Sequence, residues 1–168
     1  MTKISMLLVV VSFLSGCISK REISFQKQAQ IPATAKINIV TPSDGIYMDE
    51  DYPKSGTVVA RKLVAALLPY FPNTSNVSVK NDSEFSIAPQ ILHWEDRATE
   101  WSGKPDKVKV SLPLYKSGDL IGSATVSAKS SWWTLGGDHP EDFLDLPFEV
   151  YASNLAAKTK QVRLVKVK

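Results

Sequence analysis

A β-strand with one polar and one apolar face is encoded by Lys107-Val108-Lys109-Val110-Ser111-Leu112-Pro113-Leu114-Tyr115. Valine and leucine alternate with lysine and serine, and this period of two is typical of a strand that buries one face. Turn residues follow in Lys116-Ser117-Gly118-Asp119, and residues 120–129 are predicted to return as the partner strand. The sequence therefore predicts a β-hairpin whose valines and leucines enter the core.

A strand, a helix and a second strand are predicted upstream of this hairpin. Residues 35–40 and 77–79 have the strand pattern, and apolar side chains recur between them at spacings of three and four, at Val59, Leu63, Ala66, Leu67 and Tyr70. We expect the two strands to be parallel and joined by a right-handed crossover. Residues 85–94 are a further candidate strand, in which Pro89 indicates a bulge or an edge position.

A second helix is predicted to begin in Asp138-His139-Pro140-Glu141-Asp142, because proline and acidic residues favour a first helical turn. Pro147 should kink or split this helix. Residues 159–168 are basic and are either a frayed tail or a terminal strand. The whole pattern predicts an α+β fold, in which two main helices pack on one face of a mixed β-sheet.

The composition is that of a single globular domain, which we place at residues 35–158. The chain has 168 residues, of which 43% are hydrophobic and 22% are charged, and these values exclude a collagen-like, low-complexity or wholly disordered chain. The net charge is +3 with the two signs interleaved, so no nucleic-acid-binding surface is indicated. The single cysteine excludes an internal disulfide and a cysteine-cluster zinc site.

The N-terminus has the features of a lipoprotein signal peptide at residues 1–16. Lys3 precedes an apolar run at residues 6–14, which is shorter than the roughly 20 residues of a membrane-spanning helix. Leu14-Ser15-Gly16-Cys17 resembles a bacterial lipobox, in which the thiol of the cysteine receives a diacylglyceryl group and becomes the new N-terminus. The alternatives are an ordinary signal peptide with a chance cysteine and a short membrane anchor.

Residues 17–34 are predicted to be the lipidated N-terminus and a flexible tether, because residues 19–31 are polar and offer few apolar anchors. Several acyl chains on Cys17 would hold the protein on a membrane without any help from the domain. Ile18 stands where many lipoproteins of the inner membrane have aspartate. We therefore expect the periplasmic face of the outer membrane.

One long motif resembles a known family. It is His93-Trp94-Glu95-Asp96-Arg97-Ala98-Thr99-Glu100-Trp101-Ser102-Gly103-Lys104-Pro105-Asp106, and it is similar to a signature of the DUF4823 lipoproteins of proteobacteria. Gly136-Gly137-Asp138-His139-Pro140 and Tyr52-Pro53-Lys54-Ser55-Gly56 look like further marks of that family. The resemblance implies a location and a fold, but no catalytic roles. The order of elements is also similar to the N-terminal domain of TolB and to LpoB.

The motif residues include candidates for partner binding. All four tryptophans fall in one part of the chain with cations nearby, and such rings can stack on sugars or anchor a protein partner. The candidate set is Trp94, Arg97, Trp101, Lys104, Trp132, Trp133 and His139. The alternative is that these rings are core residues or pin loops.

A metal-assisted hydrolase is the competing hypothesis, with His93, Glu95, Asp138 and His139 as ligands or acid/base groups if their two loops meet. A structural network accounts for the same residues: Asp138 and Glu141 fit helix capping, and Arg97 can pair with Glu95 or Asp96. We find no nucleophile elbow, phosphate-binding loop or dinucleotide motif, and we expect no cofactor. The sequence thus favours a non-enzymatic, lipid-anchored module that contacts an envelope protein or peptidoglycan.

Overall fold

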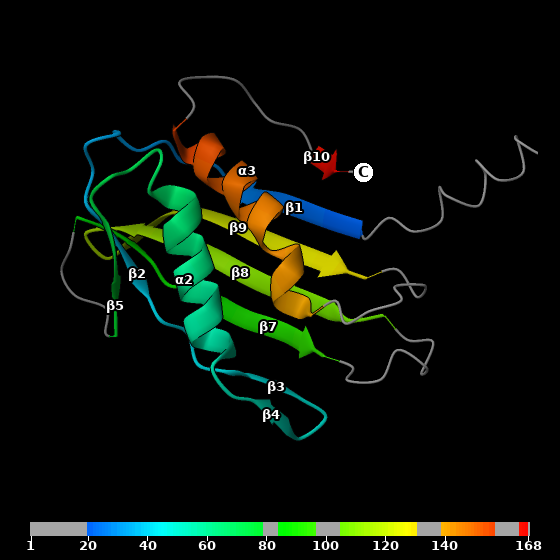
Figure 1. The fold of residues 1–168 in the computed structure, drawn as a ribbon. Coiled ribbons are helices and arrows are strands. Elements are labelled where there is room, and N and C mark those ends of the chain that lie inside the picture. The colour runs from blue at the N-terminus through cyan, green and yellow to red at the C-terminus, as the bar shows by residue number, and fades with distance from the viewer. Residues whose placement is uncertain (1–19, 79–83, 97–104, 131–138, 157–164, 168) are drawn as a thin grey trace, which may run out of the picture.

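The computed structural model describes residues 20–78, 84–96, 105–130, 139–156 and 165–167, and these build one mixed α+β layer structure (Figure 1). An eight-stranded sheet has the order β10-β1-β9-β8-β6-β2-β5, with β7 also paired to β8. Its strands are β1 (Lys20–Lys27), β2 (Ile37–Val40), β5 (Thr74–Val77), β6 (Phe85–Ile87), β7 (Gln90–Glu95), β8 (Lys107–Lys116), β9 (Asp119–Lys129) and β10 (Val165–Val167).

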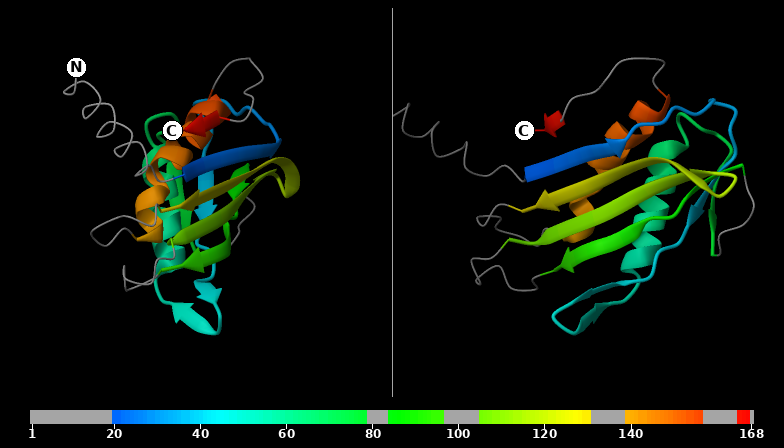
Figure 2. Two further views of the ribbon diagram at one scale, coloured as in Figure 1. Left: turned by 90° about the vertical axis from the view of Figure 1, so that its right-hand side faces the viewer. Right: turned by 180° about the vertical axis from the view of Figure 1, so that it is seen from behind.

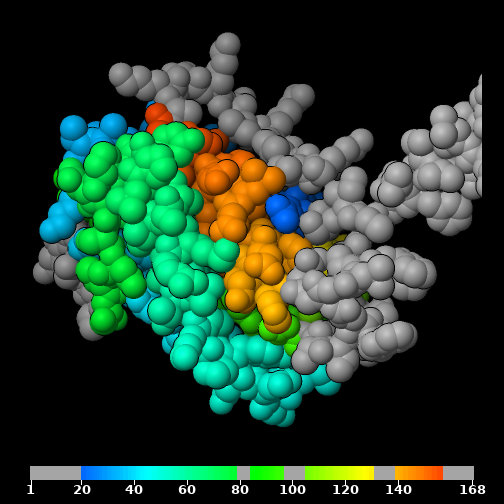
Figure 3. Space-filling view, viewed as in Figure 1, coloured from blue at the N-terminus to red at the C-terminus, as the bar shows by residue number. Residues whose placement is uncertain are grey.

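The helices α2 (Ser55–Leu67) and α3 (Asp145–Ala156) lie together on one face of this sheet, which confirms the predicted fold class (Figures 1 and 3). The short helix η2 (Pro140–Phe143) leads into α3. A separate hairpin of β3 (Gly45–Tyr47) and β4 (Glu50–Tyr52) extends away from the sheet beside β7 (Figure 2). Lys62 on α2 and Asp145 on α3 form an ion pair of 2.8 Å that links the two helices.

The β8–β9 hairpin forms as its alternation predicts. Its turn uses Ser117 and Gly118, whose φ angles of 48° and 94° are the left-handed values of a tight hairpin turn. The helix-facing side chains of both strands are buried, namely Val108, Val110, Leu112, Leu114, Ala124, Val126 and Ala128. The alternate side chains remain on the opposite face, where no helix covers them.

The predicted crossover is also present, with a shifted second strand. β2 pairs with β5 in parallel, and α2 connects them. The second strand occupies Thr74–Val77 rather than residues 77–79. Thr74 is buried and its hydroxyl donates a hydrogen bond of 2.7 Å to the carbonyl of Phe71, which fixes the start of the strand after the turn that follows α2.

The segment predicted as a flexible tether is partly wrong, because Lys20–Lys27 forms the strand β1. It pairs antiparallel with β9 and with β10, which also shows that Val165–Val167 is a terminal strand. Ile23 is buried, and the ring of Phe25 stacks on Tyr151 of α3 with centroids 6.3 Å apart. Ile23 and Phe25 therefore pack the strand against the core, although most of its other residues are polar.

Pro147 does not kink the second helix, contrary to expectation. It lies in the first turn of α3, where the missing N–H has no partner to lose. The break falls instead at Leu144, between η2 and α3. The single strand predicted at residues 85–94 is instead two strands, β6 and β7, and Pro89 lies between them.

Asp44 holds the start of α2. One carboxylate oxygen accepts a hydrogen bond of 3.0 Å from the N–H of Lys54, and the other accepts one of 2.8 Å from the N–H of Gly56. A Cβ on Gly56 would come within 2.2 Å of the carbonyl oxygen of Pro42, so only glycine permits this close approach. The loop after β2 thereby fixes where α2 begins.

We predict that Asp44→Ala lowers the free energy of unfolding by about 1–2 kcal/mol, because two N–H groups at the helix start lose their acceptor. Chemical denaturation measures the change. Asp51→Ala is the control, since Asp51 is exposed on β4, and an equal loss in both variants would contradict the capping role.

The hydroxyl of Tyr151 is buried without a hydrogen-bond partner in the described part of the chain, and burial raises its pKa. We expect Tyr151→Phe to raise the free energy of unfolding by about 1 kcal/mol, since the unsatisfied hydroxyl is removed and the ring packing is kept. Tyr70→Phe is the control, because Tyr70 lies at the surface and should change stability by less than about 0.5 kcal/mol. A destabilised Tyr151→Phe protein would show that the hydroxyl has a partner.

Candidate functional site

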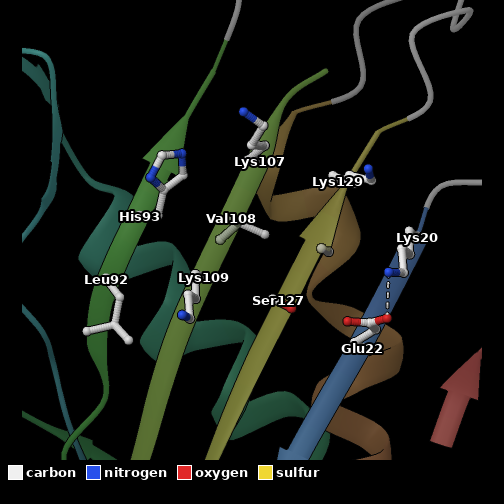
Figure 4. A pocket seen from close by; sticks show the side chains of 10 residues that line it. Lys20, Glu22, Leu92, His93, Lys107, Val108, Lys109, Ser127 and Lys129 are labelled. Carbon is white, nitrogen blue, oxygen red and sulfur yellow. Dashed lines mark ion pairs between the residues drawn. The ribbon is translucent and has the colours of Figure 1, made fainter. Parts of the chain in front are cut away.

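The face of the sheet opposite the helices is largely polar and is covered by no helix among the described residues, and we call it the open face. It consists of the alternate side chains of β7, β8, β9 and β1 (Figure 4). Lys107 of β8 is the cross-strand neighbour of Lys129 of β9, which is in turn the neighbour of Lys20 of β1. Three lysines thus stand side by side across three strands, although they lie far apart in the sequence.

A groove with a volume of about 540 Å³ lies over this part of the open face. The described residues that line it are Lys20, Glu22, Leu92, His93, Lys107, Val108, Lys109, Ser127, Ala128 and Lys129. Figure 4 shows these residues on four neighbouring strands, with the side chains of Lys107, Lys109 and Glu22 on the side away from the helices. The groove is open rather than enclosed, so it suits a surface ligand better than a sequestered reaction.

Two of the lysines are paired with carboxylates and two are not. Lys20 lies 2.8 Å from Glu22, and Lys107 lies 3.2 Å from Glu95. Within the part of the chain that the structure describes, no carboxylate lies within ion-pair distance of Lys109 or Lys129, and both side chains are exposed. The groove therefore carries an excess of positive charge.

His93 shares the carboxylate of Glu95 with Lys107. Its Nε2 lies 3.1 Å from Glu95 Oε2, and its ring meets Tyr47 of β3 edge-on with centroids 4.8 Å apart. The side chain of Glu95 is only 1% exposed, so this carboxylate is buried beneath its two partners. A buried carboxylate that is held by a lysine and a histidine is a structural arrangement rather than a free catalytic base.

His139 belongs to a different site on the helix side. Its Nδ1 lies 3.2 Å from a carboxylate oxygen of Asp96, and its backbone N–H donates to Asp142 over 3.0 Å at the start of η2. The hydrogen bond with Asp96 raises the pKa of His139; partial burial opposes that shift, and the charges of Asp96, Glu141 and Asp142 add to it. A cleft of about 330 Å³ beside it is lined by Tyr52, Lys54, Ser55, Trp94 and others.

The two histidines therefore do not form the shared site that the metal hypothesis requires. His93 lines the groove on the open face, whereas His139 lines the other cleft, and each has its own carboxylate partner. Among the described residues no group of three or more histidine, cysteine, aspartate or glutamate side chains could hold a metal ion. Asp138, the fourth predicted ligand, lies outside the described residues.

Trp94 is not available at the surface, contrary to its predicted role in partner binding. It is 3% exposed and faces the helices, and β3 packs so closely that a Cβ on Gly45 would come within 2.7 Å of the Trp94 Cβ. His139 is exposed, as a contact residue must be. The other predicted contact residues lie outside the described part of the chain: Arg97, Trp101, Lys104, Trp132 and Trp133.

The described residues that flank segments 97–104 and 131–138 contact one another. His139 meets Asp96, and the N–H of Ser130 donates a hydrogen bond of 3.0 Å to the carbonyl of Asp106. The described residues on either side of both segments thus lie at the same end of the sheet, the end at which β1 begins (Figure 1). Sequence reasoning missed Lys20 and Lys129 as site residues, because only the strand register brings them beside Lys107.

Comparison with known proteins identifies the family. The model of a domain of unknown function, DUF4823, matches residues 29–155. The chain belongs to the DUF4823 family. This match confirms the resemblance that the motif at residues 93–106 indicated, while no curated protein matches the chain.

Solved structures share the fold of this DUF4823 chain at low identity. The PelC dodecamer from Paraburkholderia phytofirmans aligns with a TM-score of 0.66 and 11% identity, over 83% of this chain and 99% of that chain. A substituted form of PelC in another crystal form aligns with a TM-score of 0.63 and 12% identity, over the same shares. A Xanthomonas campestris protein of family DUF330 aligns with a TM-score of 0.48 and 12% identity, over 74% of this chain and 88% of that chain.

These likenesses show the fold alone. The predicted similarity to the TolB and LpoB domains is not confirmed by them and stays a prediction. Within the residues that the structure describes, none of the helices has the length and apolar character needed to cross a membrane.

The raised pKa of His139 predicts a pH-dependent contribution to stability. Because the folded-state pKa exceeds the ordinary value of about 6.5, the contribution is complete below that pH and is lost as the pH rises through the folded-state value. It should be below about 1 kcal/mol, since the side chain is 55% exposed and solvent screens the pair. An NMR titration should find the pKa of His139 lowered by Asp96→Asn and unchanged by Asp51→Asn; an equal pKa in all three proteins would contradict the pairing.

Proposed function

We propose that this DUF4823 chain is a lipid-anchored protein of the bacterial envelope that acts by binding and not by catalysis. Cys17 would carry the lipid and place the domain on the periplasmic face of the outer membrane. The open face of the sheet would contact an envelope partner, which is a protein or peptidoglycan. The observation that supports the binding role is that β1, β9, β8 and β7 share a polar face over which the described part of the chain places no helix.

The chemistry of the described residues supports binding over catalysis. Glu95 is buried under His93 and Lys107, and Asp96 is engaged by His139, so these carboxylates stabilise the structure. Beyond the groove, the open face continues through Ser111 and Thr125, which are neighbours in the β8–β9 register. Small polar side chains on a strand surface can donate and accept hydrogen bonds without large loss of side-chain entropy.

The anchor is tested by mass spectrometry of the mature N-terminal peptide and by fractionation of membranes. We expect a diacylglyceryl cysteine at Cys17, and we expect Cys17→Ala to lose this mass and the partition into the outer membrane. An unmodified N-terminal peptide, or protein that leaves the membrane without detergent, would contradict the anchor.

Partner binding is tested by in-cell photocrosslinking. A photoreactive residue at Ser111, on the open face, should yield one dominant adduct with an envelope component, and the same residue at Arg61, on the exposed side of α2, should not. The fold likeness to PelC, a dodecamer, makes a second copy of this chain one partner to identify among the adducts. Equal adduct patterns at the two positions would contradict a binding role for the open face.

A further inference from the structure

The proposed lipid anchor and the sheet are separated by very little chain. Cys17 precedes Lys20, the first residue of β1, by three residues. Even fully extended, three residues span only about 10 Å. If Cys17 is lipidated as proposed above, the first residue of β1 is therefore held within about 10 Å of the lipid interface.

The same end of the sheet holds a cluster of lysines, which we call the basic end: Lys20, Lys107, Lys109 and Lys129. Lys129 is the register neighbour of both Lys20 and Lys107. Adjacent strands lie about 5 Å apart, so Lys107 is only about 10 Å from Lys20 across the sheet. The directions of the strands explain why these lysines lie together, because β1 and β8 begin at this end of the sheet and β9 ends there (Figure 1).

Like charges in register destabilise a sheet unless an anion compensates them. Glu22 and Glu95 are the acidic residues of the open face beside these lysines, and they pair with Lys20 and Lys107. Lys109 and Lys129 are left exposed with no carboxylate within ion-pair distance in the described residues. The groove over them, about 540 Å³, is open to an external anion.

We propose that the basic end binds the phosphate groups of anionic phospholipids in the membrane that carries the anchor. The inference rests on the proposed lipidation of Cys17, since that short connection is what brings headgroups rather than any other anion to these lysines. A lipid chain and a basic cluster act together, each adding to membrane affinity. The contact would orient the domain with the basic end against the bilayer. Ser111 and the rest of the open face would then face the periplasm.

The test uses lipidated protein extracted from membranes and reconstituted into vesicles of phosphatidylcholine, with or without phosphatidylglycerol. Amine acetylation rates are measured at each lysine by mass spectrometry. The mass of the N-terminal peptide is measured in the same sample, to establish whether Cys17 is lipidated. We expect acetylation of Lys109 and Lys129 to slow about fivefold or more when phosphatidylglycerol is present, and the protection to vanish at high salt. Lys116, at the other end of β8, and the exposed Lys36 should react equally in both vesicles.

Two double variants of equal net charge test whether the position of the lysines matters or only their number. Lys109→Gln with Lys129→Gln should lower the protection of Lys107 from about fivefold to nearly none, because each lysine removed weakens the headgroup contact by about fivefold. Lys36→Gln with Lys116→Gln removes the same charge and should leave the protection unchanged. Circular dichroism confirms that both double variants are folded.

The outcomes are distinguishable. A lipidated Cys17 with equal acetylation in the two vesicle types overturns the headgroup contact and leaves the proposed function standing. An unlipidated N-terminus overturns both. Protection in phosphatidylcholine vesicles that appears only on adding inorganic phosphate or purified peptidoglycan would assign the basic end to a soluble anion or to the cell wall, and would overturn the membrane contact.

Discussion

The alternation of apolar and polar side chains along β8 and β9 is the constraint on which the rest of the structure depends. Val110 and Leu112 are fully buried on one face, and a helix must cover that face to keep them from water. β8 pairs with β9, β7 and β6, so its alternation propagates through the register to most of the sheet. The opposite face of the same strands is polar and carries no helix among the described residues, which is why we propose it as the binding surface.

Strand direction connects this constraint to the candidate site. β1 and β8 start at the end of the sheet where β7 and β9 finish, and the terminal residues of all four strands meet there. Lys20, Lys107 and Lys129 become neighbours for this reason alone, and the flanks of the two tryptophan-containing segments arrive at the same end. The excess positive charge and the proposed anchor thus lie at the same end of the sheet, which supports the proposed role at a membrane surface.

The side chains of residues 93–96 lie on different faces of the sheet and do not form one common site. His93 and Glu95 lie on the open face with Lys107, whereas Trp94 is buried on the helix side. Asp96 follows the strand and meets His139 at the start of η2. One contiguous motif therefore supplies an ion-pair network, a core ring and a helix-start contact, and its residues act largely in holding β7, β8 and η2 together.

The sequence by itself determined the β8–β9 hairpin, the amphipathic helix α2 and the α+β class, because periodicity and turn residues act over short distances along the chain. It also carried the family motif and, at Leu14-Ser15-Gly16-Cys17, a tetrapeptide that resembles a lipobox. Only the tertiary structure decided that Lys20–Lys27 is a strand, since its hold on the sheet comes from Ile23 and Phe25 packing against elements over 90 residues away. The same holds for the basic end: register between distant strands, which no local pattern specifies, set its lysines side by side.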